Sequence, residues 1–227
     1  MELVQSQWSE IAMKRSVELV MLTTCAYVGC FVLSGSAGVR VLPETPGATS
    51  TLGELLSNGG FEIPAVDSGT HSALHPDGWL TFTSGKSDLV LVSNAAAHSG
   101  SQSIKFVSQA TPEFYQGLFQ TLPVTPGVIY DFTAYVISDP SSPLRGSGFG
   151  QLSIEWYDAK GTEIGGRRWG SAWNASLSSK EWTRVELEAV PPPDCARAHF
   201  VIVEKGGAQP VDGCAFFVDD VSVAKAQ

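Results

Sequence analysis

The chain has 227 residues, of which 43% are hydrophobic and only 16% are charged. This composition suits one domain of ordinary size with a substantial core, and it excludes an intrinsically disordered chain. The formal net charge is -9. Because an acidic surface repels polyanions, this charge argues against nucleic acid and anionic membrane as partners.

Residues 1–37 have the pattern of a secretory signal peptide. Residues 19–33 form an apolar run that follows a basic pair and is short for a membrane-spanning helix. Met13 stands directly before that pair, so we hypothesise that translation begins there. The surroundings of Cys30 weakly resemble a lipoprotein cleavage site, and a lipid-bearing or uncleaved N-terminal anchor is the alternative.

The rest of the chain divides into a tether and a folded domain. Residues 38–52 are rich in Pro, Gly and Thr without apolar periodicity, which predicts a flexible linker. Residues 53–225 are expected to form one domain. This organisation predicts a protein that is secreted or held at the cell surface, periplasmic or extracellular, with no membrane insertion of the mature domain.

Short alternating segments dominate the domain, and no long segment after residue 37 keeps a 3.6-residue apolar period. We therefore predict an all-β fold, a single-domain β-sandwich jelly roll. The expected strands are 54–63, 79–83, 88–93, 102–108, 114–122, 127–137, 149–157, 181–190, 196–203 and 215–223.

The last expected strand carries an unusual acid. Alternation places four residues on one face: Phe217, Asp219, Val221 and Val223. A carboxylate on an apolar face needs a cation, N–H donors or a proton, because burying an unpaired charge is costly. Asp220 is expected to point the other way, into solvent.

Short motifs stand in a characteristic order between Leu55 and Val223. They are Ser57–Glu62, Gly78–Trp79, His98–Ser101, Val124–Tyr130, Tyr157–Gly161, Trp182–Thr183 and Val218–Val221. Together they resemble the CenC-type carbohydrate-binding modules, the galactose-binding-like jelly rolls of families four, nine and twenty-two. The resemblance implies a non-catalytic, exported module that binds a polysaccharide or glycan.

The resemblance also implies a structural calcium ion near both ends of the domain. The side chains of Glu62 and Asp219 would be its ligands, with backbone oxygens of residues 99–101 contributing. Carboxylate and backbone oxygens are the ligands that calcium prefers. The alternative is that both acids accept backbone N–H groups at the rim of a sheet.

Sugar rings present an apolar C–H face and a hydroxyl rim, so a glycan site needs flat aromatic side chains with polar groups at their edges. We predict this ligand-binding set to be Trp169, Trp173, Tyr135, Tyr157, Glu155 and Gln151. The alternative is that both tryptophans only cover a loop at the sandwich edge. Trp79, Trp156 and Trp182 are expected in the core.

Two other functions stay open on the sequence. A surface β-sandwich can bind another protein or serve only as a spacer. A glycoside-acting enzyme needs two carboxylates that flank the scissile bond, and Glu155, Asp158 and Glu163 are close in sequence. Asp158 belongs to a turn motif, however, and alternation separates it from Glu155. We therefore expect no catalytic activity.

Cys195 and Cys214 are expected to be buried free thiols. In a simple antiparallel hairpin they would stand at opposite ends, beyond disulfide reach. The alternative is that the two strands lie in different sheets, which leaves a disulfide open.

Overall fold

The computed structural model describes residues 54–66, 75–85 and 89–226, all within one compact unit, Thr51–Gln227. The expected signal peptide and linker lie outside the described residues, so both stay predictions. Among the described residues, no helix is long and apolar enough to cross a bilayer.

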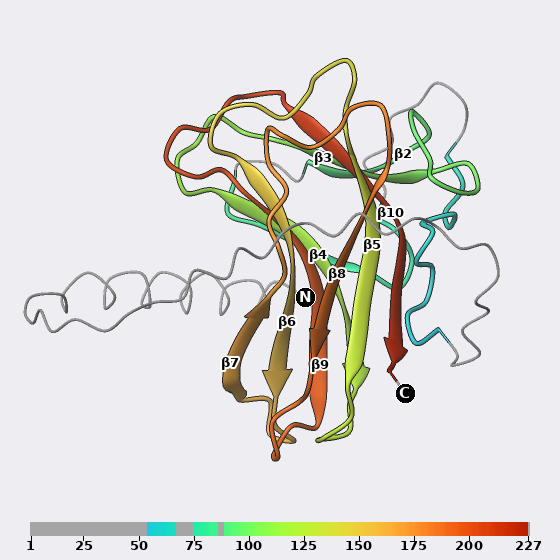
Figure 1. Cartoon of the computed structure of the whole chain (residues 1–227), viewed down its shortest axis with the longest axis vertical. Helices are drawn as coiled ribbons and strands as arrows, with labels where there is room; N and C mark the ends of the chain where they lie inside the picture. Colours follow the sequence, from blue (N-terminus) through green and yellow to red (C-terminus); the bar gives the residue numbers. More distant parts are fainter. Residues whose placement is uncertain (1–53, 67–74, 86–88, 227) are drawn as a thin grey trace, which may run out of the picture. The chain divides into compact units, whose positions relative to one another are not determined.

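In the described residues, ten strands form two antiparallel sheets of five strands each (Figure 1). The β9 sheet, named here after its central strand, has the order β1-β4-β9-β6-β7. Its strands are β1 (Leu80–Thr83), β4 (Tyr115–Pro123), β9 (Arg197–Lys205), β6 (Phe149–Tyr157) and β7 (Glu163–Trp169). The β10 sheet has the order β2-β3-β10-β5-β8. Its strands are β2 (Val90–Ser93), β3 (Ser103–Val107), β10 (Ala215–Lys225), β5 (Tyr130–Ser138) and β8 (Thr183–Ala189). The predicted all-β jelly-roll sandwich is confirmed.

The core lies between the two sheets, because alternation turns one apolar side of each strand inward. Phe132 of β5 and Phe200 of β9 are fully buried and meet edge-on across the interior, with ring centroids 5.4 Å apart. Each side chain of this kind stabilises the fold by roughly 1.5–3 kcal/mol when buried. Trp79 and Trp156 belong to the same core, as predicted.

Two strand predictions are wrong. Residues 54–63 form turns, and the φ angles of Asn58 and Phe61, 51° and 55°, are incompatible with a strand. Strand β7 is missing from the predicted set, because Gly165 and Gly166 interrupt its alternation. Both glycines have positive φ angles, and the pairing of β7 with β6 shifts register beside them.

A β-bulge in β10 reverses the expected faces of the last strand. The pairing of β10 with β5 shifts register between Asp219 and Ser222, where Asp220 has a φ of 45°. The residues of this strand that fill the core are Phe216, Val218, Val221 and Val223. Alternation alone therefore placed Asp219 wrongly: it stands opposite Tyr135, on the outer side of the β10 sheet.

Cys195 and Cys214 are buried free thiols, as predicted. The hairpin assumed in that prediction is wrong, because β9 and β10 belong to different sheets.

One acid of β9 points into the core. Glu204 has no exposed surface, and its carboxyl group accepts hydrogen bonds from Ser108 Oγ and, at 2.7 Å, from Gln116 Nε2. Burial outweighs these two hydrogen bonds and raises the pKa of Glu204 to about 7.

We predict that this group makes stability depend on pH. The folded protein binds the Glu204 proton more tightly than the unfolded chain does, so its contribution is fully present below about pH 4.5 and is lost as the pH rises through 7. The loss amounts to about 3 kcal/mol. Urea unfolding between pH 4.5 and 8 measures it, and Glu204→Gln should flatten that part of the profile. An unchanged profile in the variant would contradict the prediction.

Candidate functional site

Four predicted ligand-binding residues share the outer face of the β9 sheet, the face turned away from the β10 sheet. Gln151, Glu155 and Tyr157 alternate with the core residues of β6. Trp169 of β7 pairs with Ser153 of β6, so its ring stands on the same side and is 40% exposed. The regular alternation of β6 made Gln151, Glu155 and Tyr157 visible in the sequence. Trp169 was predicted because residues 165–179 are too polar and Gly-rich to form core.

Glu155 is only 8% exposed although it lies on an outer face, because three neighbours surround it. Tyr157 Oη donates a hydrogen bond of 2.8 Å to it, and Arg167 Nη1 lies 2.9 Å from its other oxygen. His199 Nδ1 lies 3.7 Å away. Burial alone would raise the pKa of Glu155, but His199, Arg167 and Tyr157 together lower it. The carboxylate is therefore ionised and held in place.

Tyr157 keeps its proton in this setting. Burial is the largest cause that raises the pKa of the phenol, and the charge of Glu155 adds to it. The Tyr157 hydroxyl thus acts as a fixed hydrogen-bond donor beside the carboxylate.

Four rings cross this face from strand to strand. Phe82 of β1 lies 6.3 Å from Phe119 of β4, Phe119 stacks on His199 of β9 at 4.6 Å, and His199 lies 4.3 Å from Tyr157 of β6, measured between centroids. We call these four residues the ring row. Sequence reasoning missed Phe82, Phe119 and His199, because only the strand order β1-β4-β9-β6 brings them into line.

The ring row lies beside a buried floor. Val201 and Val203 of β9 face outward, on the same side as His199, yet are only 3% and 4% exposed. Trp169 also stands on this face, and Lys205 Nζ lies 4.0 Å from its ring centroid. Tyr157 of the ring row is likewise only 4% exposed, whereas Phe82, Phe119 and His199 are partly exposed.

Two predicted ligand-binding residues lie elsewhere. Trp173 is 5% exposed, forms an isolated bridge with Gly150 and packs edge-on against Phe216 at 5.7 Å in the core. A Cβ at Gly150 would lie 2.2 Å from the Trp173 ring, so the glycine leaves the space that this ring fills. Tyr135 lies on β5 of the opposite sheet and cannot extend a platform with Trp169.

Tyr135 instead belongs to a smaller aromatic group. It stacks on His98 with centroids 3.7 Å apart, and Trp182 meets the same histidine edge-on at 5.6 Å. Trp182 is partly exposed, so its predicted place in the core is wrong.

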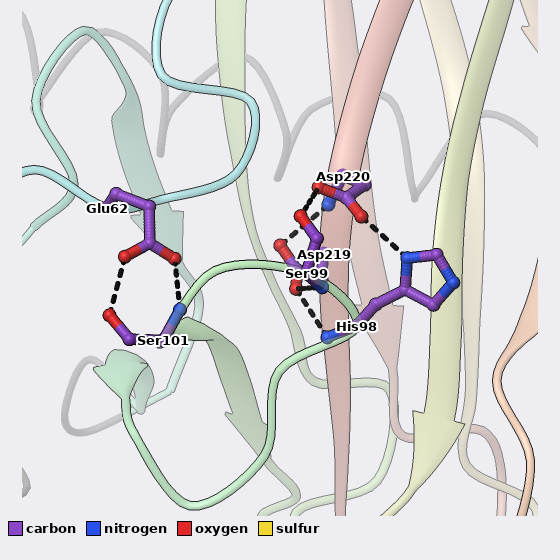
Figure 2. Close-up of polar contacts among 6 residues, drawn as sticks. All are labelled: Glu62, His98, Ser99, Ser101, Asp219 and Asp220. Atoms are coloured by element: carbon purple, nitrogen blue, oxygen red, sulfur yellow. Dashed lines mark hydrogen bonds and ion pairs between the residues drawn. The ribbon is translucent and has the colours of Figure 1, made fainter.

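Both predicted calcium ligands contact the loop of residues 98–102 (Figure 2). Glu62 Oε1 accepts the N–H groups of Ser101 and Gln102 at 2.9 and 3.0 Å, and Ser101 Oγ donates to Glu62 Oε2 at 2.7 Å. Asp219 Oδ2 accepts the N–H groups of His98 and Ser99 at 2.7 and 3.2 Å. We call these two acids, with Asp220, the carboxylate clamp.

Asp220 was expected to point into solvent, which is wrong. The bulge turns it toward the same loop, where its carboxylate contacts His98 Nδ1 and Ser99 Oγ, both at 2.6 Å (Figure 2). Burial raises the pKa of Asp219 to about 6, and the charge of Asp220 adds a smaller contribution. No Lys or Arg of the described residues forms an ion pair with the clamp.

The clamp supplies part of the ligand set that calcium prefers. It gathers carboxylates with a single basic neighbour, His98, and hard cations bind carboxylate oxygens. The carboxylate oxygens of Glu62 and Asp219 already accept backbone N–H groups. This is the arrangement expected if the two acids only bind N–H groups at the rim of a sheet and no calcium ion. Within the described part of the chain, no group of three or more His, Cys, Asp or Glu is arranged to hold a metal. A calcium ion would thus need backbone oxygens as well.

The turn that presents Glu62 is held by close backbone contacts. Val221 N donates to Gly59 O at 2.9 Å, and a Cβ at Gly59 would lie 2.0 Å from Val221 O. At Gly60 a Cβ would make an ordinary contact of 3.6 Å with Asp220.

We predict that Gly59→Ala destabilises the protein by about 2 kcal/mol or more, because the new methyl group must displace β10 backbone. Gly60→Ala is the matched control and should stay within about 1 kcal/mol of the parent. Urea midpoints measure both variants. Equal midpoints would show that the turn is not held against β10 in this way.

No protein-family model matches the sequence, and no curated protein matches it either. Solved structures are similar in fold. The enzymatically active domain of tailspike protein 4 from bacteriophage CBA120 has a TM-score of 0.54 and 15% identity over 76% of this chain. The arabinose-bound α-L-arabinofuranosidase MgGH51 has a TM-score of 0.54 and 18% identity over 78% of it. This chain spans only 21% of the tailspike chain and 27% of the arabinofuranosidase chain.

Carbohydrate-binding modules are also among the similar structures. The CBM22-1 xylan-binding domain of Paenibacillus barcinonensis Xyn10C has a TM-score of 0.49 and 14% identity, over 79% of this chain and 99% of its own. At these identities the likeness concerns the fold, and function has to be argued from the site.

Proposed function

We propose that this protein binds a polysaccharide or another glycan on the outer face of the β9 sheet and does not cleave it. The observation that carries the proposal is the ring row, which crosses four strands beside the buried Glu155 cluster. Aromatic faces suit the C–H faces of sugar rings, while ionised and hydroxyl groups suit their hydroxyl rims.

The polar groups of this face are held before any ligand arrives. Glu155 is fixed by Tyr157 and Arg167, and Gln151 Nε2 donates to Gly170 O at 2.6 Å. Fixed side chains lose little conformational entropy on binding, which favours affinity. Glu155 can accept a sugar hydroxyl, and Arg167 can donate to one.

The same geometry supports a non-catalytic role. A glycosidase needs a carboxyl group that is protonated near neutral pH, whereas the pKa of Glu155 is lowered. Asp158 accepts the N–H groups of Lys160 and Thr162 at 2.9 and 2.8 Å and closes a turn. Glu155 and Asp158 therefore do not form the carboxylate pair that the enzyme hypothesis requires.

We predict that Trp169→Ala and Phe119→Ala each weaken glycan binding about 5- to 30-fold, through loss of a stacking face. The melting temperature of Trp169→Ala should change by less than about 3 °C, because this ring is 40% exposed. Affinity gels with a panel of soluble polysaccharides measure retention.

Trp182→Ala is the matched control, since it removes an equal ring from the opposite face. Retention on no polysaccharide of the panel would reject glycan binding and favour a surface protein that binds another protein. Unchanged retention in Trp169→Ala and Phe119→Ala would place the site elsewhere.

We also propose that Glu62 and Asp219 hold a structural calcium ion, together with backbone oxygens of residues 99–101. The support is electrostatic: Asp219 has no exposed surface, and Asp220 beside it adds a second negative charge. Calcium would neutralise these acids and tie the turn before β1 to the last strand. Outside the cytoplasm, where the signal-like residues 1–37 would direct the protein, calcium is available for such a role.

Calcium binding to the folded state alone should raise stability by about 2.7 kcal/mol at a hundredfold excess over Kd. We predict that chelation lowers the melting temperature, and that Glu62→Gln removes the difference between chelated and calcium-loaded samples. Glu188→Ala, on an exposed strand, should leave that difference intact. The absence of a calcium-dependent shift in the parent protein would reject the site and leave the hydrogen-bonded clamp as the explanation.

A further inference from the structure

The outer face of the β9 sheet differs in charge from the chain as a whole. The chain carries a formal net charge of -9. On this face the strands contribute two acids, Glu155 and Glu163, against the cations Arg167, Arg197 and Lys205. The aromatic face of an acidic protein is thus locally basic.

The two acids of this face share one cation. Arg167 contacts Glu155 at 2.9 Å and Glu163 at 3.2 Å, so one guanidinium group serves both carboxylates. Neither Arg197 nor Lys205 forms an ion pair with any residue in the described ranges. These two side chains are therefore the cations of this face outside the Arg167 ion pairs, and its strands contribute one more cation than acids.

Lys205 is placed beside the exposed aromatic side chain of the face. Its ammonium group lies 4.0 Å from the centroid of Trp169, a cation–π contact that fixes its position. Burial is the largest cause that lowers the pKa of Lys205, and the positive charge of Arg167 lowers it further. The negative charge of Glu113 raises it. No acid of the described residues lies within ion-pair distance of this ammonium group, so an anion of a ligand can contact it beside Trp169.

We propose that the glycan bound on this face is acidic, and that Lys205 holds one of its anionic groups beside Trp169. This inference rests on the proposed function. Arg197 offers a second cation at the other end of β9, eight residues and about 26 Å away, a span that a polymer with repeated charges covers. Remote acids of the protein oppose such a ligand weakly, because the Debye length is about 8 Å at physiological salt.

Carboxylates of uronic acids and sulfate esters both fit an ammonium group, so the test separates them. Affinity gels contain polygalacturonate or its carboxyl-reduced neutral counterpart, and in a second pair dextran sulfate or dextran. We expect retention by an acidic polymer and weaker retention by its neutral partner. The first pair reports carboxylate recognition and the second reports sulfate recognition.

Lys205→Gln should weaken retention by the acidic polymer about two- to fivefold, the range for a solvent-accessible charge pair, and should make it less sensitive to salt. Lys225→Gln makes the same charge change on β10 and should behave like the parent. Equal retention by charged and neutral polymers, or an unchanged Lys205→Gln, would overturn this inference and leave glycan binding standing. Retention by none of these polymers or of the wider panel would instead remove the proposed function.

Discussion

The contact of Asp219 with the backbone of residues 98 and 99 joins parts of the chain that are 120 residues apart. Asp219 has no exposed surface although it lies on the outer side of a sheet, so its charge must be met by fixed groups. Two N–H groups of the loop and the N–H of Asp220 meet it. Glu62 does the same for the second half of the loop. The entry into β3, the middle of β10 and the turn before β1 are therefore positioned together.

The two outer faces of the sandwich carry different kinds of side chain. The clamp, His98 and Tyr135 occupy the outer side of the β10 sheet, where carboxylates outnumber cations. On the β9 sheet the central strand presents Val201 and Val203 outward, and the rings of Phe119 and Tyr157 lie on its two neighbouring strands. Separation of the acidic clamp from the ring row follows from the sandwich itself, because each lies on a different sheet.

The alternation of residues along a strand correctly predicted the face of each side chain wherever the strand is regular. It assigned Gln151, Glu155 and Tyr157 to one side of β6 without any knowledge of the partners of that strand. It failed at the bulge of β10, because a single residue with positive φ, Asp220, exchanges the two faces. It failed again at β7, where a pair of glycines interrupts the pattern.

Other features depend on the order of the strands in each sheet. The apolar pattern along a single strand gives no information about that order. Trp173 enters the core because Gly150, 23 residues earlier, leaves a space for its ring. Phe119 and His199 stack because β4 and β9 are neighbours, although 80 residues separate them in the chain. The polar residues of β6 can therefore be predicted from the sequence of that one strand. The ring row cannot, because it forms only when four strands pair in the right order. Each of the four strands contributes one ring, so a different strand order would break the ring row even if all four residues were kept. The aromatic face therefore depends on this particular fold.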